Sequence, residues 1–126
     1  VDERAPRRRG VLRDGRSRHR AAKSAGSEAA ACAAHAAGDA AAAAYLHPLA
    51  QATQVGHILR AGAYAALASA LDANDPTVGD RFVVAEARRM PATVRSVLGR
   101  YPAAPTGRTR VAQLMTMLDE QVRATR

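Results

Sequence analysis

Apolar residues recur at helical spacing along most of the chain, and proline, glycine, asparagine and aspartate separate the repeats. The clearest pattern has apolar residues at i, i+3, i+4, i+7 and i+11: Val111, Leu114, Met115, Leu118 and Val122. This spacing places them on one face of a helix over residues 110–124. Nowhere is there a convincing alternation of apolar and polar residues, as in a half-buried strand. The pattern therefore predicts an all-α protein.

The same spacing and its breakers predict helices earlier in the chain. Ser27 is a good N-cap. Pro48 ends a helix because the residue before proline avoids helical geometry. We therefore expect helices over residues 18–25, 27–46 and 49–73. The third carries an apolar stripe with small residues that allow close helix packing: Val55, Ile58, Leu59, Gly62, Ala63, Ala66, Ala70 and Leu71.

Two more helices are expected before the last one. Residues 74–76 read Asn-Asp-Pro, which is typical of a turn, and Asp75 or Thr77 is placed to cap a helix over residues 78–90. Pro91 suits the first turn of a short helix ending at Leu98. Residues 99–109 hold two glycines and two prolines and are predicted to form a loop. Together these segments predict a compact, alanine-rich helical bundle of about five to six helices.

Composition changes the picture of the core. Alanine supplies 32 of the 126 residues, and tryptophan is absent. Alanine is the best helix former because it loses no side-chain entropy, but it buries little apolar area. We expect closely packed helix backbones and modest stability, with a partner or a second copy of the chain completing the bundle.

The net charge of +8 is concentrated in one segment. Residues 1–23 carry nine positive and three negative groups, so the remaining residues are close to neutral. We expect residues 1–19 to form a basic, flexible N-terminal arm and residues 20–126 to form a single helical domain. Such an arm is either a solvated tail or a contact for phosphate or for an acidic partner.

The single cysteine and the apolar segments indicate the cellular compartment in which the protein is expected. Cys32 alone excludes an internal disulfide framework and fits a reducing compartment. The basic start is followed by no apolar run, so no signal peptide is expected. The alanine-rich segment 29–46 contains His35, Gly38 and Asp39, which argues against a membrane span. We expect a cytoplasmic protein without membrane contact.

Catalytic or metal chemistry has few candidate residues. Cys32, His35 and Asp39 share one helix face and would form half of a metal site, with His47 or His57 needed for the other half. Either of these two histidines would serve as a general base, but no nucleophile or carboxylate is evident beside it. We therefore interpret both as structural and expect neither an enzyme nor a cofactor.

The tyrosines divide into two groups. Tyr45 and Tyr64 are interpreted as core or helix-packing residues. Tyr101 lies in the predicted loop between Arg100 and Arg108, and an exposed tyrosine among arginines is typical of a binding anchor. The alternative is a tyrosine that pins the loop onto the bundle. Arg100, Tyr101 and Arg108 are the candidate partner-binding residues.

Three stretches resemble a known family. Residues 45–59 read YLHPLAQATQVGHIL, residues 63–66 read AYAA, and residues 100–108 read RYPAAPTGR before the last helix. Together they resemble bacterial immunity proteins of polymorphic toxin systems, which have an alanine-rich helical domain. The resemblance covers about residues 20–123. Some members carry an exonuclease-subunit label, but the nucleotide-binding and coiled-coil features that it demands are missing here.

The resemblance implies a cytosolic protein that binds a cognate toxin protein and blocks it by occlusion. Two alternatives stay open. One is a small basic protein that contacts nucleic acid through the N-terminal arm, and the other is a helical domain that binds metal or catalyses a reaction through its histidines.

Overall fold

The computed structural model describes residues 27–42 and 52–125. Within these ranges the chain forms five α-helices and no strand, which confirms the predicted all-α class. The helices are α2 (Glu28–Ala42), α3 (Ala52–Ala73), α4 (Pro76–Arg89), α5 (Ala92–Leu98) and α6 (Arg110–Ala124).

Side-chain caps fix where three of these helices begin. The Ser27 hydroxyl accepts from the Ala30 amide at 3.1 Å, as the sequence predicts. Of the two candidate caps for α4, Asp75 is the N-cap, and its carboxylate accepts from the Thr77 amide at 3.0 Å. The Thr109 hydroxyl likewise caps α6. Each cap satisfies an amide that has no partner inside its helix.

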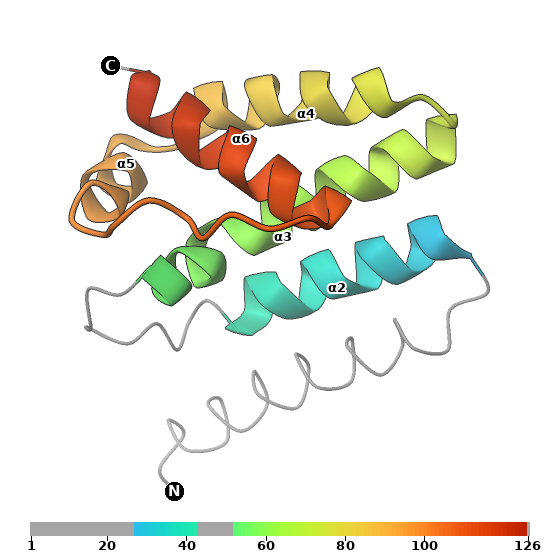
Figure 1. Ribbon diagram of the computed structural model, residues 1–126, viewed down its shortest axis with the longest axis horizontal. Helices are drawn as coiled ribbons and strands as arrows, with labels where there is room; N and C mark the ends of the chain where they lie inside the picture. The colour runs from blue at the N-terminus through green and yellow to red at the C-terminus, as the bar shows by residue number, and fades with distance from the viewer. Residues whose placement is uncertain (1–26, 43–51, 126) are drawn as a thin grey trace, which may run out of the picture.

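Helix α3 is the central element of the fold. Helix α2 packs along one side of α3, and α4 and α6 pack against its other sides (Figure 1). The chain reverses between α3 and α4 through Asn74, whose φ of 49° is in the left-handed region. The Asp75 amide then donates to the Ala70 carbonyl at 3.0 Å, so the turn stays tight.

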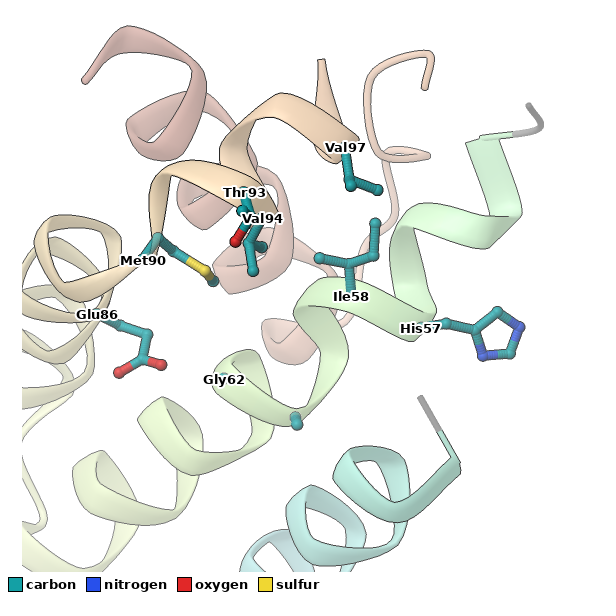
Figure 2. A pocket seen from close by; sticks show the side chains of 9 residues that line it. His57, Ile58, Gly62, Glu86, Met90, Thr93, Val94 and Val97 are labelled. Atoms are coloured by element: carbon teal, nitrogen blue, oxygen red, sulfur yellow. The ribbon is translucent and has the colours of Figure 1, made fainter. Parts of the chain in front are cut away.

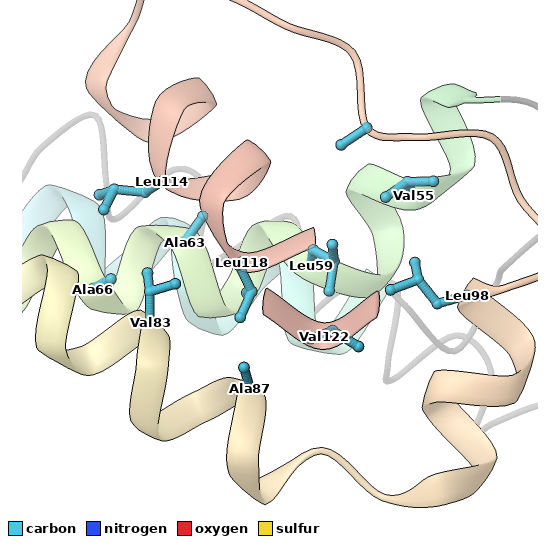
Figure 3. Packing of buried hydrophobic residues seen from close by; sticks show 11 residues of the cluster. Val55, Leu59, Ala63, Ala66, Val83, Ala87, Leu98, Leu114, Leu118 and Val122 are labelled. Carbon is cyan, nitrogen blue, oxygen red and sulfur yellow. The ribbon is translucent and has the colours of Figure 1, made fainter. Parts of the chain in front are cut away.

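The hydrophobic core lies where α3, α4 and α6 meet (Figure 3). Leu98 at the end of α5 and Ala104 in the following loop close it. The predicted apolar face of α6 is confirmed, because three of its residues are almost completely buried and the other two are partly buried. The largest fully buried side chains are Leu59, Leu98, Leu114, Leu118, Val55, Val83 and Val122.

The apolar stripe predicted for α3 separates into two parts. Val55, Leu59, Ala63, Ala66 and Ala70 are buried, whereas Ile58, Gly62 and Leu71 remain partly exposed. A single stripe describes a helix with one buried face, but α3 has neighbours on several sides. Its apolar residues therefore serve more than one surface.

Small residues bring α3 and α4 close together. A Cβ atom at Gly79 of α4 would lie 3.2 Å from both the Ala66 carbonyl oxygen and the Ala70 Cβ atom. Any side chain at position 79 would thus push the two helices apart. Ala63 and Ala66 are fully buried, as expected for alanines in close helix packing.

Several predictions concern residues outside the described ranges. They include the basic segment 1–19, the short helix over residues 18–25, and His47 and Tyr45. In the described part of the chain, none of the helices combines the length and the apolar character needed to cross a membrane.

Candidate functional site

Residues 99–109 form a loop, as the sequence predicts. The loop runs from α5 to α6 and crosses over α3 (Figure 1). Asp119 of α6 helps to hold this loop, and both of its carboxylate oxygens accept hydrogen bonds. Oδ2 accepts from the Ala104 amide at 2.9 Å, and Oδ1 accepts from Nε of Arg123 at 2.8 Å. Arg123 in turn donates to the carbonyls of Tyr101 and Pro102 at 3.0 and 2.9 Å. Two side chains of one helix therefore bind three backbone groups of the loop, at Tyr101, Pro102 and Ala104.

The other end of the loop is also held on α6. Gln113 donates from its amide to the Arg108 carbonyl at 3.4 Å. Gly107 approaches so closely that a Cβ atom there would lie 2.8 Å from the Ala112 Cβ atom. The Thr109 hydroxyl then caps the helix. The loop is therefore held on α6 near both of its ends.

The candidate binding residues differ in their placement. Arg100 and Arg108 are exposed, and their guanidinium groups form no ion pair or hydrogen bond within the described part of the chain. Tyr101 is partly buried and packs against the core, which favours the alternative role of pinning the loop. The two arginines, rather than the tyrosine, are the groups that the loop presents.

Sequence reasoning missed Asp119 and Arg123, although a signal was present. Asp119 is spaced four residues from Met115 and three from Val122, so it lies in register with the apolar face of α6. Its exposed fraction is 3%. A carboxylate in a buried register, with an arginine at i+4, indicates a buried polar contact.

Polar residues also gather between α2 and α3. The rings of His35 and Tyr64 stack with centroids 4.8 Å apart and an interplanar angle of 21°. Asp39, which is buried, forms an ion pair with Arg60 at 3.8 Å between Oδ1 and Nη1. Tyr64 thus has the helix-packing role that the sequence predicts, with a histidine as its neighbour.

Burial between α2 and α3 raises the pKa values of two weak acids, Cys32 and Tyr64. Burial raises the pKa of the Cys32 thiol, and the nearby charge of Glu28 raises it further. Burial also raises the pKa of Tyr64, with the Asp39 carboxylate adding to the effect. Both groups therefore stay protonated at neutral pH, and Cys32 is a poor nucleophile because the reactive form is the thiolate.

Cys32, His35 and Asp39 on α2 were the predicted half of a metal site, and His47, one of the two residues proposed for the other half, lies outside the described ranges. Among the described residues, no group of three or more His, Cys, Asp or Glu side chains is placed to hold a metal ion. Asp39 faces Arg60, and the His35 ring lies against Tyr64. The contacts along this face are therefore those of helix packing.

His57 lies at the edge of a groove between α3, α4 and α5 that has a volume of about 480 Å³. Glu86 lines the same groove, but Figure 2 shows the His57 ring pointing away from it and from the groove interior. The two groups are not arranged as an acid and base pair. The lining is mostly apolar: His57, Ile58, Ala61, Gly62, Glu86, Met90, Thr93, Val94 and Val97.

Comparison with known proteins found no relative of this chain. No model of a protein family, no curated protein and no solved structure matches the chain.

Proposed function

We propose that this chain is a non-catalytic protein-binding domain that acts as an immunity protein in the bacterial cytoplasm. It binds a cognate toxin protein and covers the surface that the toxin needs for its activity. The observation that supports this proposal is the loop at residues 99–109, which α6 holds through hydrogen bonds. Arg100 and Arg108 of this loop are exposed, and their guanidinium groups have no partner among the described residues.

A held loop favours binding because little conformational entropy is lost when a partner docks. Binding residues often lie on loops that a rigid scaffold positions. Arginine is also enriched among the residues that dominate binding energy, because its planar group binds carboxylates through two parallel hydrogen bonds. The surface on the toxin that meets this loop therefore carries carboxylates.

Co-expression with candidate toxin proteins encoded beside this gene tests the proposal. The double variant Arg100→Ser and Arg108→Ser removes both loop charges and leaves the bonds of Asp119 and Arg123 in place. We expect it to bind the toxin at least about tenfold more weakly, which corresponds to ~1.4 kcal/mol, and to lose growth protection. Affinity is measured by titration calorimetry and protection by colony counts.

The matched control is the double variant Arg81→Ser and Arg88→Ser, which removes two exposed arginines of α4. It should bind and protect like the unmodified protein. Equal protection by the loop variant, or a loss shared equally by both variants, would show that the loop is not the binding surface. Failure of the unmodified protein to bind any neighbouring toxin would contradict the immunity function itself.

A further inference from the structure

The groove between α3, α4 and α5 has mostly apolar walls (Figure 2). Ile58, Ala61 and Gly62 form the α3 side, and Val94 and Val97 form the α5 side. Met90, just after α4, closes one end. The volume of about 480 Å³ is that of a binding site for several apolar side chains, and the groove is open rather than enclosed.

The lining of this groove includes one carboxylate. Glu86 is the single acidic residue of the lining, and its side chain is 28% exposed. Arg89 binds one of its two oxygens, but the Arg89 side chain is 68% exposed and is not part of the lining. An occupant therefore meets apolar walls and one carboxylate, which has an oxygen that Arg89 does not bind. A basic group on the occupant would be attracted there, and an acidic one would be repelled.

We propose that this groove docks a short amphipathic helix of a partner protein, with a lysine or arginine beside its apolar stripe facing Glu86. Helices α3 and α5 each line one side of the groove, and apolar residues at i, i+4 and i+7 of a third helix fit such a groove. The described residues offer no sheet edge to which an extended peptide would add as a strand. The proposal does not depend on the loop at residues 99–109 or on the immunity function.

Methyl NMR of the three methionines provides the test. Met90 lies in the groove, whereas Met115 and Met117 lie on α6 and serve as internal references. The probe is a capped helical peptide with leucines at i, i+4 and i+7 and one lysine beside the first leucine. A second peptide replaces that lysine with glutamate. We expect a saturable shift of the Met90 signal and about fivefold tighter binding of the lysine peptide.

Variants of the full chain separate charge from shape. Glu86→Gln should abolish the preference for lysine, whereas Glu120→Gln, at an exposed position of α6, should preserve it. Ala61→Leu fills the groove and should weaken both peptides at least about fivefold, whereas Ala85→Leu on the exposed side of α4 should not. The proposal is overturned if the lysine peptide leaves Met90 unmoved. Equal shifts of all three methionines, or equal affinity of the two peptides, overturn it as well.

Discussion

At the scale of single residues, the Asp119 carboxylate holds the loop at residues 99–109 against α6. A buried carboxylate is tolerated only when its oxygens are bonded, and here each oxygen has a donor. One donor is a backbone amide of the loop, and the other is Arg123, which binds two loop carbonyls. One side chain thereby links the helix, the loop and a second charged residue.

Removal of this carboxylate should lower the stability of the whole domain. Asp119→Ala leaves the Ala104 amide buried without an acceptor and removes the partner of Arg123. We expect a loss of about 2–3 kcal/mol in the free energy of unfolding, because hydrogen bonds to charged groups are worth more than neutral ones. Urea unfolding followed by circular dichroism measures it. Glu120→Ala, at the exposed neighbouring position, should change stability by less than about 0.5 kcal/mol.

At the scale of the helices, stability depends on how each helix begins. Helix α4 has Asp75 as N-cap and Pro76 in its first turn, where the missing amide of proline is no disadvantage. Thr77 donates to the Asp75 carboxylate from both its hydroxyl and its amide. These two bonds lower the pKa of Asp75, because they favour its ionised form.

The lowered pKa predicts how this helix responds to acid. A carboxylate whose pKa is lower in the folded protein contributes stability above its unfolded pKa and loses it as the pH falls through the folded value. At pH 6 we expect the unmodified protein to have a higher melting temperature than Asp75→Ala. The gap should narrow below about pH 4. A gap that stays constant down to pH 2 would contradict the role of the ionised cap.

The helices were largely predictable from sequence, and the loop contacts were not. Caps such as Ser27 and the spacing on α6 act within a few residues, so local patterns locate the helices well. The bonds from Arg123 to the loop span 21 and 22 residues and depend on the course of a segment without periodicity. The groove beside Ile58 and Gly62 likewise depends on where α5 packs. Arg100 and Arg108 were proposed from sequence because they flank Tyr101 in a segment rich in proline and glycine.

At the scale of the whole molecule, a few large side chains packed around the central helix α3 contribute much of the stability. Many buried positions are alanines, which contribute little apolar area, so the fully buried leucines supply a large share. Leu59 lies in the middle of this set, with no exposed surface. The loss of one large core side chain should therefore remove a large part of the free energy of unfolding.

Leu59→Ala tests this distribution. We expect a loss of about 3 kcal/mol, since the cavity adds to the lost transfer free energy. Leu71→Ala, near the end of the same helix and partly exposed, should lose less than half as much. Both values come from urea unfolding at constant pH. Equal losses at the two positions would show that the core does not centre on the α3–α4–α6 junction.

The way the helices pack also has a kinetic consequence. The pairs α2–α3 and α3–α4 join helices that follow each other in the chain, so short loop closures suffice to form them. Helix α6 has its main contacts with α3 and α4, which both lie further back in the chain. Proteins with mostly local pairings fold quickly, and their speed is limited by the most distant ones. Docking of α6 is therefore the step that we expect to set the folding rate.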